Sequence, residues 1–238
     1  MEWTFEELQV WDEKIVKLAK KYNLDWFPID YEVCDYHDMI GYMSYIGMPT
    51  HYQHWSYGKS FERTHTMYNL GMEGLPYEMI INSDPSISYL MSENPLALQV
   101  LIMAHCVGHS DFFKNNRMFK HTDAANVIAR FRNAAKRIKK YSDNPHIGVD
   151  AVEKAIDACH ALKYHNYREF GINRKSHEEI RQGYVDIANF KPEQLPEDFN
   201  INKIPLEPDY DILGFIAKHS RNLEPWQRDI INIVREES

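Results

Sequence analysis

Residues 76–119, PYEMIINSDPSISYLMSENPLALQVLIMAHCVGHSDFFKNNRMF, contain the strongest strand and helix signals in the chain. The run Tyr77–Ile81 is short, apolar and rich in side chains that favour β-strands, and turn-forming residues end it at positions 82–85. We therefore predict a strand here, as part of a small β ribbon near residues 50–82.

A helix start follows the predicted strand. Asn94 suits the N-cap position, and Pro95 suits the first helical position, where no backbone N–H is needed. Apolar side chains then lie on almost every side of the helix from Leu96 to Val107, which is typical of a buried helix. We expect this buried central helix over about residues 95–113. The predicted fold class is mainly α (α+β), a multi-helix domain around this helix with a small ribbon.

Amphipathic patterns predict further helices on both sides of this stretch. They cover residues 5–22, 35–46, 122–141, 149–167, 209–219 and 223–236. Residues 190–209 contain four prolines and several acidic residues, which predicts an extended linker. A chain of 238 residues can form one large domain, and we expect residues 1–238 to be a single domain with this linker inside it.

Two histidines lie four residues apart on the predicted central helix. His105 and His109 share one helical face, so their imidazoles can bind one ion of zinc or another divalent metal. A catalytic zinc site would add a carboxylate, and Glu78 on the neighbouring strand is attractive because a buried carboxylate needs a partner. Histidine pairs also occur as hydrogen-bonded core residues. The other candidates for a third ligand are Glu62, Asp111, His51 and His54.

Cys106 directly follows the first of these histidines. In H-E-x-x-H peptidases a glutamate at that position acts as the general base, and a cysteine has no carboxylate for this role. Three alternatives therefore stay open: a metal-dependent hydrolase of another kind, a regulatory protein that acts through protein contacts, and a redox switch at Cys106.

The composition argues against several functional classes. The net charge of −8 disfavours a general nucleic-acid binder, and no apolar run approaches the roughly 18 residues of a membrane span. Three widely spaced cysteines do not make a disulfide framework, and the acidic N-terminus lacks a signal-peptide core. We therefore expect a cytoplasmic protein. The predicted helix over residues 122–141 is basic in its second half. These basic residues form either a solvated surface or a docking patch for an acidic partner.

Four motifs in fixed order resemble the SpoVR family, stage V sporulation protein R. They are GMPTHYQHWSYGKSFE (residues 47–62), YEMIINSDP (77–85), YLMSEN (89–94) and HCVGHSDFFKNN (105–116). The N-terminal helix and the closing segment WQRDIINIVREE (226–237) also fit the layout of the family. The resemblance therefore covers essentially the entire chain.

The resemblance implies a cytoplasmic protein of the sporulation and stress pathways. Family members are linked to spore cortex formation in endospore formers and to stress responses in other bacteria. They are commonly encoded beside a PrkA-type serine kinase and a von Willebrand A-like protein, which implies a regulatory role through these partners. The family pattern continues into a segment with a T-K-I-M-N-E-G-W-A-like motif, whose glutamate is a further candidate metal ligand. We expect this chain to be either truncated before that segment or a short family member that lacks it.

Overall fold

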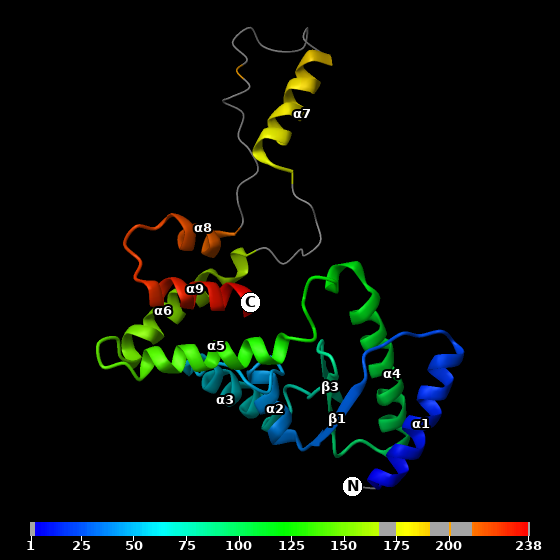
Figure 1. Cartoon of the computed structure of the whole chain (residues 1–238). Coiled ribbons are helices and arrows are strands. Elements are labelled where there is room, and N and C mark those ends of the chain that lie inside the picture. The colour runs from blue at the N-terminus through cyan, green and yellow to red at the C-terminus, as the bar shows by residue number, and fades with distance from the viewer. Residues whose placement is uncertain (1–2, 167–174, 191–199, 201–210, 238) are drawn as a thin grey trace.

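A computed structural model describes residues 3–166, 175–190, 200 and 211–237 of the chain (Figure 1). Helices dominate it and accompany one small sheet, so the predicted mainly α (α+β) class is confirmed. The helices are α1 (Phe5–Lys21), α2 (Tyr36–Ser44), α3 (Trp55–Asn69), α4 (Leu96–Asn115), α5 (Val127–Ser142), α6 (Val149–Leu162), α7 (His177–Phe190), α8 (Ile212–His219) and α9 (Pro225–Glu237). The linker predicted over residues 190–209 lies almost wholly outside the described residues.

The sheet has three strands in the order β1-β3-β2. They are β1 (Ile29–Cys34), β2 (Glu78–Ile81) and β3 (Ser86–Met91). The central strand β3 pairs in antiparallel fashion with β2 and in parallel with β1. A parallel pair needs a long crossover connection, and the chain between β1 and β3 supplies it through α2, α3 and β2.

The position of the sheet differs from the predicted ribbon over residues 50–82. The strand predicted at residues 77–81 is present as β2, but residues 55–69 form α3, whose N-cap is His54. The pattern also does not predict β3, because two of its inward side chains are serines. Ser86 bonds to the Ser110 hydroxyl, with the two oxygens 3.0 Å apart, so a polar residue is stable in this buried strand.

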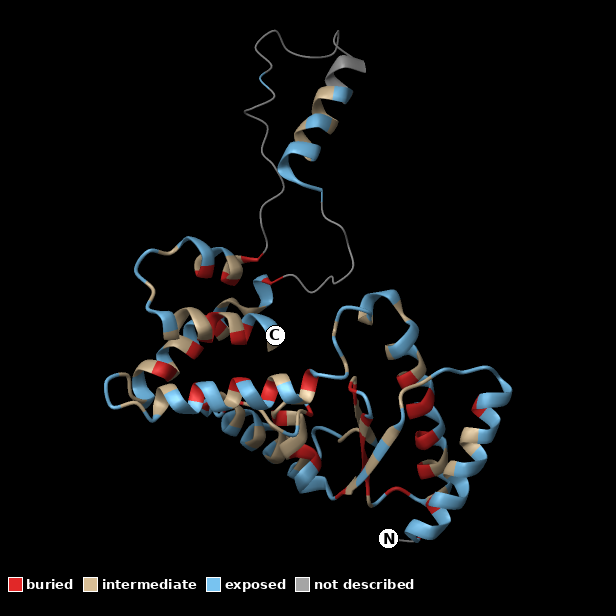
Figure 2. Cartoon of the chain, viewed as in Figure 1, coloured by how far each residue is buried: buried red, intermediate tan, exposed pale blue. Residues whose placement is uncertain are grey.

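α4 packs against both the sheet and α1, and part of its surface stays exposed (Figure 2). Ile102, Met103 and Cys106 are buried in these contacts, whereas Leu101 is 68% exposed. The expectation of a helix buried on nearly all sides is therefore wrong. α4 also carries apolar residues on its exposed surface. By length and composition alone, α4 is long and apolar enough to cross a membrane, which by itself is weak evidence for a span. The side chain of Asn94 bonds to Gln99 and does not cap the helix.

A second core lies among the later helices α5, α6, α8 and α9. Its fully buried side chains include Ile156 of α6 and Ile230 of α9. The helices predicted over residues 122–141, 149–167, 209–219 and 223–236 correspond to these four, with α5 beginning five residues later than predicted. α7 is an additional helix that the amphipathic patterns do not include.

Candidate metal centre

The strand β2 directs Glu78 toward α4. Ile80, two residues after Glu78, packs against the apolar cluster that includes Ile102 and Cys106 of α4. Residues two apart on a strand point to the same face, so the Glu78 side chain leaves the sheet on the α4 side. Leu90 of the central strand is the register partner of Glu78 and is fully buried, which fixes the strand at this point.

The helix α4 brings its two histidines to this carboxylate. The Nε2 atom of His105 lies 3.7 Å from Oε1 of Glu78, and it lies 2.8 Å from Nε2 of His109. One ligand atom from each of the three residues lies within 4.8 Å of the other two. Two nitrogens on one tetrahedral zinc ion would be about 3.3 Å apart. Shifts of about half an ångström to one ångström would therefore close the three groups around a single ion.

The surroundings of His109 favour the neutral form of its imidazole. Burial lowers the pKa of His109 below its usual value, the neighbouring His105 lowers it further, and Glu78 opposes both effects. A lowered pKa keeps the imidazole neutral, which is the form that binds a metal. The side chain of His105 is 59% exposed, so solvent and small molecules can reach this side of the group.

Cys106 points away from the histidines and into the core. Its Sγ atom lies 3.2 Å from the hydroxyl of Ser88, and the residue is fully buried. Burial raises the pKa of this thiol to about 11, the opposite of what a reactive cysteine needs. The thiol is thus neither a general base for the histidine pair nor suited to a redox switch.

The structure does not bring the other candidate ligands to this group. Asp111 accepts hydrogen bonds from the backbone of Asp25 and from Asn115, so it ties α4 to the segment after α1. Glu62 is exposed on α3. His51 and His54 lie in a different cluster, at the junction of the 50–57 segment with the later helices.

This second cluster is largely buried and contains two groups that the sequence patterns do not single out, His160 and Glu237. Nε2 of His160 lies 2.8 Å from the hydroxyl of Tyr52, and Nε2 of His51 lies 3.6 Å from Oε2 of Glu237. Nε2 of His54 lies 3.3 Å from Oδ1 of Asp157. The residues are far apart in sequence, so no local spacing could have revealed the cluster.

Burial keeps His51, His160 and Glu237 largely uncharged near neutral pH. It lowers the pKa of His51 and of His160 to about 4, and it raises the pKa of Glu237 to about 8. In the described part of the chain, neither carboxyl oxygen of Glu237 has a hydrogen-bond partner. We interpret the cluster as a structural junction that joins the 50–57 segment to α6 and α9.

Replacing Glu237 with glutamine should stabilise the protein at alkaline pH. The folded state raises the pKa of this group to about 8, so its stabilising contribution is complete below the unfolded value of about 4.5. That contribution is lost as the pH rises to about 8. Glutamine cannot ionise. The free energy of unfolding of E237Q should therefore exceed that of the parent protein by on the order of 2 kcal/mol at pH values above about 8.

Urea unfolding at acidic, neutral and alkaline pH measures this difference. The exposed neighbour Glu236 supplies the control, since E236Q should change the stability little at any pH. A difference between E237Q and the parent protein that does not vary with pH would show that Glu237 does not titrate as described.

Comparison with known proteins places the chain in a family. A family profile described as "SpoVR like protein" matches residues 2–238, and the chain therefore belongs to the SpoVR family. It is 38% identical, over an alignment of 253 residues, to the uncharacterised protein YcgB of Escherichia coli strain K12. That alignment covers 100% of this chain and 49% of YcgB, so the chain spans about half the length of this relative. No solved structure matches the chain.

Proposed function

We propose that this SpoVR-family chain binds one divalent metal ion, with zinc as the first candidate, and is a metal-dependent hydrolase domain. The observation that supports this most directly is the convergence of Glu78, His105 and His109 within 4.8 Å, from a strand and a helix that are both held by the core. Two histidines and one carboxylate, with a further position left open, form a known ligand set of catalytic zinc sites.

The three residues would have two different roles in metal binding. His105 and His109 hold the ion from one face of α4, and Glu78 supplies the negative charge that offsets its positive charge. A bound ion would act as a Lewis acid and lower the pKa of a water molecule. The exposed side of His105 leaves room for a substrate. Cys106 occupies the position of the general-base glutamate of H-E-x-x-H peptidases, so the domain would not use that glutamate-dependent peptidase mechanism.

Metal analysis of untagged protein tests the first half of this proposal. After exposure to zinc and exhaustive buffer exchange, we expect one zinc per chain by elemental mass spectrometry. A small activated ester such as p-nitrophenyl acetate tests the second half. Its hydrolysis should require zinc and should be lost in H105A. Zinc below one-tenth of an equivalent in the parent protein would contradict metal binding, and zinc binding without hydrolysis would contradict the hydrolase assignment.

We propose, as a second candidate, a cytoplasmic regulatory role in sporulation or stress responses. The PrkA-type kinase and the von Willebrand A-like protein would be its partners. The observation that favours it is a basic surface on α5, where Arg132, Lys136 and Lys140 are exposed. Within the described residues, no salt bridge involves these three side chains. Unpaired cations on one helix suit an acidic surface of a partner protein.

Binding measurements with the two purified partner proteins test this role. The double charge reversal K136E/K140E should weaken complex formation by about tenfold or more, and the complex should weaken as salt rises. The same change on α1, K17E/K21E, is the matched control. Equal affinities for the two double variants would exclude the α5 surface as the docking site.

A further inference from the structure

A cavity of about 400 Å³ lies between α8 and α9, which pack against each other (Figure 1). We call it the α8 cavity. The described residues that line it belong to α8, to its N-cap Asp211 and to α9, whereas the candidate metal centre lies between β2 and α4. The two sites are therefore separate. The volume of the α8 cavity falls in the range of pockets that bind small organic molecules.

Hydrogen bonds to the two ends of α8 hold the arginines of this cavity. Arg228, Asn232 and Arg235 lie four and three residues apart, so they share one face of α9. Asp211, the N-cap of α8, accepts hydrogen bonds from Nε of Arg235 at 2.8 and 2.9 Å. The carbonyl of Ser220, the C-cap, accepts one from Arg228 at 3.1 Å. Both guanidinium groups are therefore fixed in the wall of the cavity.

The α8 cavity carries two positive charges that no acid of its described lining offsets. Asp211 is the one acid among the described lining residues, and its salt bridge with Arg235 neutralises both groups. Lys218 and Arg228 remain, and within the described residues neither takes part in a salt bridge. A phosphate monoester carries a charge of about −1.5 to −2 at neutral pH. Its charge therefore matches that of these two cations.

Lys218 and Arg228 lie at the same end of the cavity. Arg228 is bonded to Ser220, and Lys218 lies two residues before Ser220 in the last turn of α8. Cations at this position also complement the helix dipole, but the C-terminus of a helix carries only about half a negative charge. Most of the two positive charges is left over, and Arg228 has N–H groups that Ser220 does not use. These groups suit the oxygens of a phosphate.

Two rings of α8 line the cavity beside these cations. Phe215 and His219 lie four residues apart, their ring centroids are 4.5 Å apart, and Phe215 is 56% exposed. His219 directly follows Lys218, so the rings and the cations can contact one small molecule. Nucleobases stack on aromatic side chains, because every base has a flat π face.

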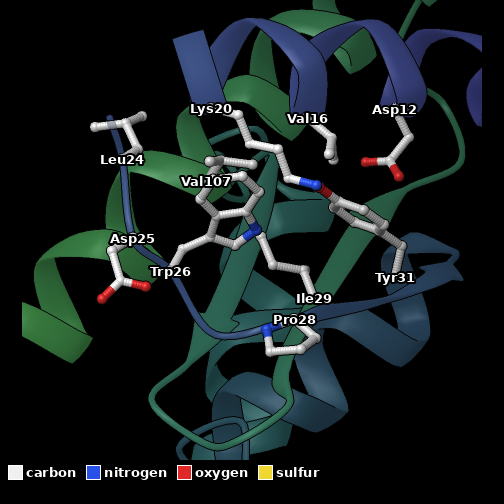
Figure 3. A pocket seen from close by; sticks show the side chains of 10 residues that line it. All are labelled: Asp12, Val16, Lys20, Leu24, Asp25, Trp26, Pro28, Ile29, Tyr31 and Val107. Carbon is white, nitrogen blue, oxygen red and sulfur yellow. The ribbon is translucent and has the colours of Figure 1, made fainter. Parts of the chain in front are cut away.

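The cavity between α1 and β1 does not define the charge of a ligand in this way. Its volume is about 490 Å³ (Figure 3). The ammonium of Lys20 and the carboxylate of Asp12 both lie near Tyr31, so opposite charges stand close together in it. Asp25, the other acid of its described lining, is paired with Lys114. The charges around this cavity are therefore balanced, unlike those of the α8 cavity.

From the two cations and the rings beside them, we propose that the α8 cavity binds a nucleoside monophosphate. Its phosphate lies on Lys218 and Arg228, and its base lies against Phe215. This proposal is independent of the metal centre and of the hydrolase assignment.

Calorimetric titration of the full chain with adenosine monophosphate tests this proposal. Metal-free protein and buffer exclude an ion that could hold the phosphate at the candidate metal centre. Adenosine lacks the phosphate and inorganic phosphate lacks the ring, so each can make only one of the two contacts. Both should therefore bind at least about tenfold less tightly than adenosine monophosphate.

Two variants assign each contact to its side chain. K218M should weaken adenosine monophosphate and inorganic phosphate by about tenfold each, because it removes one charge-assisted contact and keeps the apolar stem of the lysine. F215L should weaken adenosine monophosphate similarly and leave inorganic phosphate unchanged, because it removes only the ring. Both side chains are exposed, so neither change removes a buried group. K17M and F5L, at exposed positions of α1, are the matched controls outside the cavity.

Three results would overturn the proposal. They are the absence of binding heat with millimolar adenosine monophosphate at two temperatures, adenosine or inorganic phosphate binding as tightly as the nucleotide, and losses in K218M and F215L no larger than in the two controls. Inorganic phosphate that binds as tightly as the nucleotide would show an adventitious anion site only. Circular dichroism of every variant verifies that the fold is retained.

Discussion

Replacing His109 with alanine is expected to weaken zinc binding by about a thousandfold. The imidazole of His109 is one of three groups that can contact the ion, and its lowered pKa keeps it available as a neutral ligand. Without it, only His105 and Glu78 remain, and two ligands hold zinc weakly. Competition with a chromophoric chelator at neutral pH measures the affinity of the parent protein and of H109A.

A distant histidine supplies the control for this variant. His146 is exposed in the connection between α5 and α6, so H146A should bind zinc as the parent protein does. Equal zinc affinities for H109A and the parent protein would exclude His109 as a ligand. A comparable loss in H146A would point to zinc bound at scattered surface histidines.

Replacing Leu90 with alanine should lower the free energy of unfolding by about 2–5 kcal/mol. Leu90 is fully buried in the central strand β3 and packs in the cluster that contains Ile102 and Met103 of α4. Removing its side chain loses apolar burial and leaves a cavity between the sheet and α4. Urea unfolding followed by circular dichroism measures the change.

Leu101 of α4 is the matched control for this core substitution. It is 68% exposed, so L101A should change the stability by about 0.5 kcal/mol or less. Equal losses for L90A and L101A would mean that α4 is buried on both faces, against the arrangement described above. The pair of variants therefore tests which face of α4 meets the sheet.

The sequence predicts the helical part of the fold better than the sheet. Periodic apolar residues identify α1, α2, α4 and α9 closely and α5, α6 and α8 with errors of three to five residues at one end, and they miss α3 and α7. They do not identify β1 and β3, because strand alternation in β3 is carried partly by buried serines that hydrogen-bond to α4. Local composition cannot show that a serine will find a partner 24 residues away, as Ser86 does with Ser110. Such a partner is known only once the sheet has formed.

The residues of the candidate metal centre could be proposed from the sequence because most of them are close neighbours along the chain. Helical periodicity alone places His105 and His109 on one face, and strand alternation beside a known turn makes Glu78 a natural neighbour. The buried cluster around Glu237 could not be predicted from the sequence. It unites segments near residues 51, 160 and 237, and nothing in the spacing of these residues indicates that they meet.

The incomplete burial of α4, which packs on the sheet and on α1 but leaves the His105 side chain 59% exposed, explains why the candidate metal centre is open to solvent. The face with Ile102 and Cys106 is fixed against the sheet, so the face that carries His105 points toward solvent at the edge near β2. A helix buried on every side would have enclosed the imidazoles and left no route for an ion or a substrate. The exposed surface of α4, which the apolar pattern does not predict, is thus what leaves the candidate metal centre open to solvent.

Anomalous diffraction at the zinc edge, from crystals of zinc-loaded protein, tests the central claim most directly. The account predicts one dominant peak between β2 and α4, with the two Nε2 atoms of His105 and His109 and a Glu78 oxygen each about 2.0–2.2 Å away. A peak elsewhere on the chain, or crystals that bind no zinc while the two imidazoles stay hydrogen-bonded to each other, would contradict it.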